Sequence, residues 1–221
     1  MSILFVLLTF LVILVFNYFY FRAPQQLPVQ PEAFTRKPSQ MITKELGFAV
    51  PQGYSFHPGH TWAAKEGGEN VRVGLDNFAA DLIGKVDKIE IASPRRWVRQ
   101  GQRLMTLQAD GVSMDLLSPV EGVVMAVNQE VVKDPAIAMK DPYKDGWVAV
   151  LKSPDLPTNQ KNLLQGPMVA PWMNYSMNRL TTAAAGANPA LAQDGGVPIK
   201  GFLLKAAPEL RQKLIQDFFL S

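Results

Sequence analysis

The sequence predicts a mainly β domain that is preceded by one transmembrane helix and followed by an α-helical extension. Three observations predict this fold class. An uncharged apolar run fills the N-terminus, short β-branched runs bounded by turn residues fill the middle, and longer amphipathic patterns lie near the C-terminus. The chain has 221 residues, which is enough for one domain with attachments or for two small domains.

The N-terminal run, Ile3–Phe21, contains no charged residue, and all charged residues of the chain follow it. As an α-helix it would be about 28 Å long, which matches the hydrocarbon thickness of a bilayer. A cleaved signal peptide is disfavoured because no basic residue precedes the run and YFYFRAPQQ offers no small-x-small cleavage site. The basic residues that begin at Arg22 predict a single pass through the inner (cytoplasmic) membrane, with the N-terminus outside and the C-terminal domain cytoplasmic.

Changes in composition and residue pattern along the sequence divide the chain into four regions. We expect a transmembrane helix at residues 1–22, a Pro-rich linker at 23–52, a β domain at 53–155 and a helical extension at 156–221. Strands are expected at Val71–Leu75, Lys85–Ile91, Leu104–Leu107, Met114–Leu117, Gly122–Val127 and Trp147–Leu151, and one or two helical turns at Phe78–Ile83.

Two amphipathic helices are predicted in the C-terminal extension. Pro171 opens the first, and Pro208 suits the first helical position of the second. Their apolar stripes must be buried, either on the core of the same domain or against a partner, and the sequence leaves both alternatives open. The candidate interaction residues on these stripes are Trp172, Met173, Met177, Leu210, Leu214 and Phe218.

The composition excludes several kinds of chemistry. The absence of cysteine rules out disulfides, thiolate metal sites and a Cys nucleophile. His57 and His60 are the only histidines, too few for a stable zinc site, so both are expected to be structural. No nucleophile elbow or phosphate-binding glycine loop is present. We therefore predict that the chain is not an enzyme and has no catalytic or metal-binding residues.

An arginine-rich segment, SPRRWVRQGQR, is the most conspicuous polar feature of the β region. Its candidate interaction residues are Arg95, Arg96, Trp97 and Arg99. Such a cluster could contact anionic lipid head groups or an acidic protein face, or could be a solvated loop. Nucleic acid is the weakest alternative, because the net charge is only +3 and the predicted membrane anchor favours the others.

The middle of the chain resembles the H-protein of the glycine cleavage system. The resemblance rests on YSFHPGHTW (Tyr54–Trp62), the Ser118-Pro119-Val120-x-Gly122 turn and the Asp141-Pro142-Tyr143-x-x-Gly146-Trp147 segment, which stand in the order of that family. It implies a barrel-sandwich hybrid, the fold of lipoyl domains. It also implies a lipoylated lysine on an exposed hairpin just before the Ser-Pro turn.

The hairpin of this chain departs from that pattern. It reads QADGVSMD from Gln108 to Asp115, and Gly111 stands at the place implied for the lipoyl lysine. Lipoylation requires a primary amine, and no lysine lies between Arg103 and Lys133. Asp110 and Gly111 nevertheless form a favourable type I′ turn pair. We therefore expect no cofactor on this hairpin.

These observations lead to one main hypothesis and two alternatives. The main hypothesis is a non-catalytic, non-lipoylated structural or interaction subunit of a membrane protein complex, such as a photosynthetic reaction-centre or respiratory assembly. The membrane, through residues 3–21, and other subunits would be its partners. The alternatives are a periplasmic membrane-fusion-type adaptor and a lipoyl-type carrier of one-carbon metabolism. A lipoyl adduct on any lysine would exclude the main hypothesis.

Overall fold

The computed structural model describes residues 8–9, 11–15, 42–45, 48–187 and 200–220. The chain forms two units, Met1–Arg36 and Lys37–Ser221. The first unit contains a short described helical stretch within residues 8–15. No helix in the described part of the chain has the length and apolarity needed to cross a bilayer. Much of the predicted span Ile3–Phe21 and most of the predicted linker lie outside the described residues.

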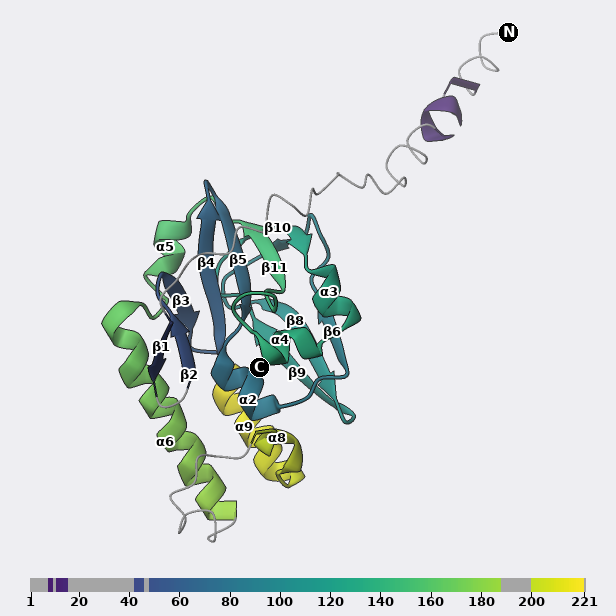
Figure 1. The fold of residues 1–221 in the computed structure, drawn as a ribbon. Helices are drawn as coiled ribbons and strands as arrows, with labels where there is room; N and C mark the ends of the chain where they lie inside the picture. The colour runs from purple at the N-terminus through teal and green to yellow at the C-terminus, as the bar shows by residue number, and fades with distance from the viewer. Residues whose placement is uncertain (1–7, 10, 16–41, 46–47, 188–199, 221) are drawn as a thin grey trace. The chain divides into compact units, whose positions relative to one another are not determined.

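The second unit is built on antiparallel sheets, so the prediction of a mainly β domain is confirmed (Figure 1). A six-stranded sheet has the order β3-β4-β5-β11-β10-β7, a three-stranded sheet the order β6-β8-β9, and β1 pairs with β2. The strands are β1 (Ile42–Glu45), β2 (Phe48–Pro51), β3 (Tyr54–His57), β4 (Thr61–Gly67), β5 (Asn70–Leu75), β6 (Lys88–Ile91), β7 (Trp97–Val98), β8 (Arg103–Ala109), β9 (Val112–Leu117), β10 (Gly122–Val127) and β11 (Ala149–Lys152).

Helices cover the edges and ends of these sheets (Figure 1). They are α2 (Asn77–Ile83), α3 (Gln129–Lys133), α4 (Ala136–Lys140), α5 (Leu156–Gln160), the 3-10 helix η2 (Gly166–Met168), α6 (Val169–Ala187), α8 (Phe202–Lys205) and α9 (Pro208–Phe219). The carboxylate of Asp76 caps α2 by accepting a hydrogen bond from the Ala79 amide at 2.8 Å. Pro208 occupies the first turn of α9, as predicted, whereas α6 begins before Pro171.

The expected strands agree with the structure in position and differ at their ends. Gly122–Val127 has the predicted bounds, whereas β6 begins only at Lys88 and not at Lys85. The preceding residues do not continue the strand, although the Asp87 amide donates to the Gln108 carbonyl at 2.8 Å. Lys85 therefore lies in the connection between α2 and β6. Strands β1, β2, β3, β4 and β7 were not among the expected strands, and β1 and β2 fall within the predicted linker.

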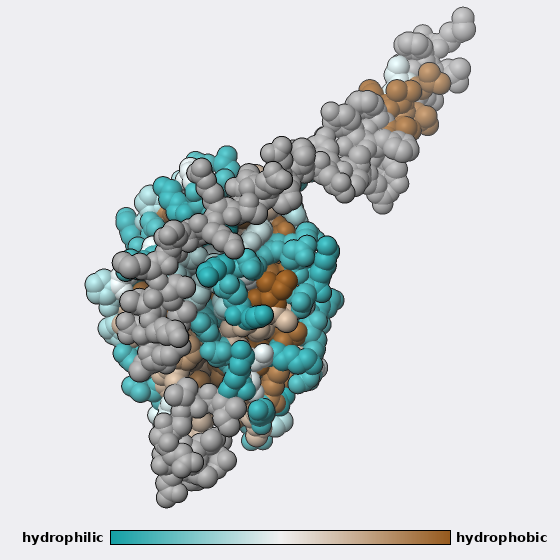
Figure 2. All heavy atoms as spheres, in the orientation of Figure 1, coloured by the Kyte–Doolittle hydropathy of each residue, from teal (hydrophilic) through white to brown (hydrophobic). Residues whose placement is uncertain are grey.

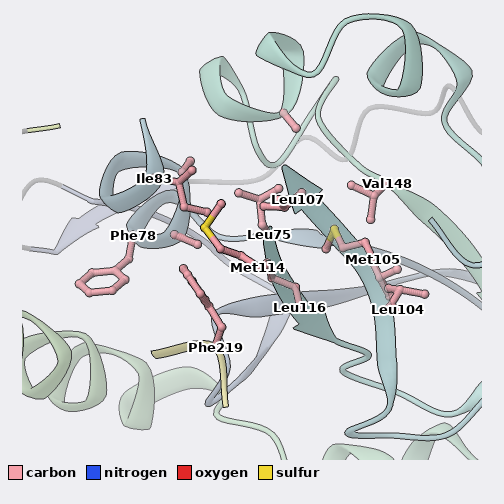
Figure 3. Packing of buried hydrophobic residues seen from close by; sticks show 14 of the residues in the cluster. Leu75, Phe78, Ile83, Leu104, Met105, Leu107, Met114, Leu116, Val148 and Phe219 are labelled. Carbon is pink, nitrogen blue, oxygen red and sulfur yellow. The ribbon is translucent and has the colours of Figure 1, made fainter. Parts of the chain in front are cut away.

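The two larger sheets bury one common hydrophobic core. Leu107 of β8, Met114 of β9 and Val148 beside β11 are at most 1% exposed and belong to the same cluster. Figure 3 shows Phe219 of α9 approaching this core from the side on which Phe78 of α2 lies. The sheets and helices consequently form one packed body, in which the hairpin of β8 and β9 is anchored at its base.

The C-terminal helices pack on the domain that precedes them. Met173, Leu214 and Phe218 are 0%, 0% and 2% exposed, and Met177 is also buried. The Phe218 ring lies 5.2 Å from the Phe78 ring between centroids. Trp172 and Leu210 are partly buried against the same core. Of the two alternatives for these stripes, packing on the chain's own core is the one observed, and it leaves these side chains little surface for a partner.

The residues of the recognised motifs build this fold. Tyr54 and Trp62 pack with Tyr143 in a second cluster, where the Tyr54 hydroxyl donates to the Tyr143 carbonyl at 3.0 Å. Burial raises the pKa of Tyr54 to about 12, so this phenol stays protonated and remains a donor. The indole of Trp62 donates to the Leu75 carbonyl at 2.8 Å. These contacts hold the cluster together and serve the fold.

Gly122 is required by a close approach of two strands. A Cβ atom at this position would lie 2.4 Å from the carbonyl oxygen of Lys152 in β11. We predict that Gly122→Ala lowers the free energy of unfolding by about 1–3 kcal/mol, because the backbone must shift to admit the methyl group. Gly67→Ala is the matched control, since its Cβ would meet nothing within 4 Å. Urea unfolding of both variants tests this, and equal stabilities would contradict it.

Candidate functional site

The turn between β8 and β9 forms the exposed tip of a hairpin whose base is buried. Ala109 pairs with Val112, so Asp110 and Gly111 are the two central turn residues. Their φ angles are 47° and 75°, the positive values that a type I′ turn requires. A Cβ atom at Gly111 would meet nothing within 4 Å, so the surroundings of the tip are open. The predicted hairpin is therefore present, and its turn carries no amine.

The connection between α2 and β6 lies beside this turn. The Asp110 amide donates to the Asp87 carboxylate at 2.9 Å, which ties the tip to the start of β6. The same carboxylate pairs with the Lys85 ammonium at 2.9 Å. The Lys85 nitrogen also lies 4.0 Å from the Asp110 carboxylate. We call Lys85, Asp87, Asp110 and Gly111 the hairpin corner.

Hydrogen bonding shifts the pKa values of the charged groups at the hairpin corner. The hydrogen bond from Lys85 lowers the pKa of Asp87, and the Asp110 amide lowers it further. The hydrogen bond to Asp87 raises the pKa of Lys85. Both side chains are well exposed, so these interactions fix the geometry of the corner more than they stabilise the fold.

The hairpin corner predicts a specific titration. Because the folded pKa of Asp87 is depressed, its contacts form above that pKa and are lost as the pH falls through it. We expect the Asp87 carboxyl carbon to titrate with a midpoint below the ordinary value of 3.8 in NMR. Lys85→Gln should raise that midpoint, whereas Lys88→Gln, which removes the partner of Glu90, should leave it unchanged. A midpoint that is the same in the wild type and both variants would contradict this arrangement.

The arginine-rich segment lies at the other end of β8. Its backbone is held to β10, since the Arg95 amide donates to the Val124 carbonyl at 2.7 Å. Arg96, Trp97 and Arg99 are exposed, the indole by 45%. The structure thus brings the four predicted residues onto one loop and edge strand, about 20 Å of strand away from the hairpin tip. Their partner remains a prediction.

The two histidines have structural surroundings. His60 is 1% exposed, and its Nδ1 lies 2.8 Å from the Asp76 carboxylate. Its ring stacks on Phe78 and Trp172, with centroid separations of 4.2 and 4.7 Å. His57 accepts a hydrogen bond from the Gly59 amide. Among the described residues no group of three His, Cys, Asp or Glu side chains could hold a metal ion.

Comparison with known proteins identifies the family of this domain. The glycine cleavage H-protein family matches residues 54–174, more than half of the chain and including the whole hairpin. The chain belongs to the glycine cleavage H-protein family. The predicted resemblance is thereby confirmed, as is the mainly β, lipoyl-type fold.

Individual relatives show the extent of the similarity. The glycine cleavage system H protein of Magnetococcus marinus is 31% identical over 125 residues, which are 57% of this chain and 88% of the relative. That of Legionella pneumophila is 37% identical over 105 residues, 48% of this chain and 82% of the relative. The crystal structure of the Mycobacterium marinum H protein has a TM-score of 0.44 and 25% identity, covering 48% of this chain and 87% of that one.

These relatives overturn the main functional hypothesis. They are glycine cleavage system H proteins, and they match the alternative of a lipoyl-type carrier better than a structural subunit of a membrane complex. The hypothesis gave too much weight to one missing lysine and one apolar segment, against a family match of more than half the chain. The prediction that the chain is not an enzyme is confirmed, because H-proteins are non-catalytic carriers.

Sequence reasoning missed one feature of the site. Only the stretch between Arg103 and Lys133 was searched for a lysine. Because Lys85 was predicted to begin the strand Lys85–Ile91, its position beside the turn was not recognised. The signal that finds it is the pairing of β6 with β8, in which Lys88 lies opposite Gln108.

Proposed function

We propose that this chain is a carrier of the glycine cleavage type, a lipoyl-type domain of one-carbon metabolism. The observation that supports this most strongly is the H-protein family match over residues 54–174, which spans both larger sheets and the hairpin. A carrier has to present a covalently attached group to separate enzymes, and so it needs an exposed attachment corner on a rigid body. The hairpin corner has that form.

The residues of the chain divide this task. The base of the hairpin is fixed by buried side chains such as Leu107 and Met114, which are at most 1% exposed. The tip is exposed, and the Asp87 carboxylate limits its motion. Reactions on the carried group belong to the enzymes that the carrier visits. The domain itself holds the arm, positions it and offers a surface for recognition.

We further propose that Gly111 occupies the place of the family's lipoyl lysine. The register of the hairpin supports this, since position 111 is the second of the two turn residues and no lysine lies between Arg103 and Lys133. The arm of this protein would then be attached outside the turn.

The carrier function predicts activity in a reconstituted glycine cleavage system. The protein is first incubated with lipoic acid, ATP and a lipoate–protein ligase, and then replaces the H protein of the system. We expect CO₂ release from glycine that depends on this protein and on the lipoylation step. The H protein of Legionella pneumophila is the positive control. If the release of CO₂ is no greater than in a reaction without any H protein, the proposal is contradicted.

We also propose that residues 3–21 attach the protein to a membrane, with the domain on the cytoplasmic side. The absence of charge from this run and the basic residues that follow it support the proposal. The full chain should remain in the membrane fraction after an alkaline carbonate wash, whereas a shortened chain in which Met1 is followed directly by Ala23 should not. If the carbonate wash releases both proteins from the membrane fraction to the same extent, membrane attachment is contradicted.

A further inference from the structure

Lys85 supplies the primary amine that the hairpin turn lacks. Its nitrogen lies 4.0 Å from the Asp110 carboxylate, and its side chain is 69% exposed. An arm that starts at this nitrogen would leave the protein from the same corner as an arm attached to the turn itself. We infer that Lys85 is the lipoyl attachment site of this carrier, an inference that rests on the proposed function.

The backbone around Lys85 is held on both sides. Gly84 ends α2 with a φ of 79°, and a Cβ atom there would lie 2.6 Å from the backbone of Gly201. On the other side, Val86 is 6% exposed and the Asp87 amide is bonded to β8. Lys85 therefore projects from a short fixed segment.

Lys88, the neighbouring lysine, differs from Lys85 in its position relative to the turn and in its ion-pair partner. Lys88 is similarly exposed, at 62%, but it lies within β6 opposite Gln108, before the turn is reached. Its ammonium pairs with Glu90 at 2.7 Å and not with a residue of the tip. Lys88 is consequently the matched control for Lys85. Because exposed ion pairs contribute little to stability, replacing either lysine should leave the fold intact.

The attachment reaction needs an activated lipoyl donor. This donor is lipoyl adenylate, in which the lipoyl carboxyl group is joined to the phosphate of AMP. The Lys85 nitrogen attacks the carboxyl carbon of the lipoyl group, and an amide bond forms. The bond from that carbon to the phosphate oxygen breaks, and AMP leaves with the bonding electrons. Two of the three ammonium protons pass to solvent and the third stays on the amide nitrogen; the Asp87 carboxylate, 2.9 Å away, is placed to relay one of the two. Nothing is oxidised or reduced.

The test uses the full-length protein with lipoic acid, ATP and a lipoate–protein ligase. Intact mass and peptide mapping should show one lipoyl group on Lys85. Lys85→Arg keeps the charge but has no primary amine to acylate, so it should lose the group completely. Lys88→Arg should be modified like the wild type. Thermal unfolding of the two variants should coincide, which shows that the loss is not caused by misfolding.

Gly111→Lys distinguishes failure of the site from failure of the carrier function. It places an amine on the turn, where the surroundings are open although φ is 75°. A lipoyl group on another wild-type lysine, or one retained in Lys85→Arg, would overturn the assignment to Lys85 and leave the carrier function standing. An unmodified wild type beside a modified Gly111→Lys would overturn both. A modified Lys85 in the wild type supports both.

Discussion

The carboxylate of Asp87 holds the hairpin corner together. It accepts a hydrogen bond from the Asp110 amide and pairs with the Lys85 ammonium, so one side chain joins the turn to the segment that precedes β6. The turn and this segment are far apart in the sequence, and the antiparallel pairing of β6 with β8 brings them together. The identity of the amine at this corner, and hence the chemistry of the domain, depends on that pairing.

The corner is useful to a carrier because it projects from a well-packed domain. Both larger sheets share one core, and the C-terminal helices close it with side chains such as Phe218 and Phe219. On the face of the second unit drawn in Figure 2, hydrophilic residues make up most of the described surface, and hydrophobic residues gather near its middle. The apolar stripes of the C-terminal helices belong to the core, because Met173, Leu214 and Phe218 are buried in it.

Local patterns in the sequence predicted the local features of the fold. The turn at Asp110 and Gly111 and the start of α9 at Pro208 depend on the conformational preferences of a few adjacent residues. The family motifs predicted the fold because their aromatic residues pack in one cluster. The place of Lys85 depends on a partner strand, which no local pattern reveals. The function was misjudged because the missing lysine at Gly111 was given more weight than a family resemblance that extends over more than half of the chain.

The most direct test of the account is the intact mass of the protein isolated from the cells that produce it. We expect the mass of the polypeptide plus one lipoyl group. A native protein that carries no acyl group on any lysine, in cells whose other lipoyl proteins are fully modified, would contradict it.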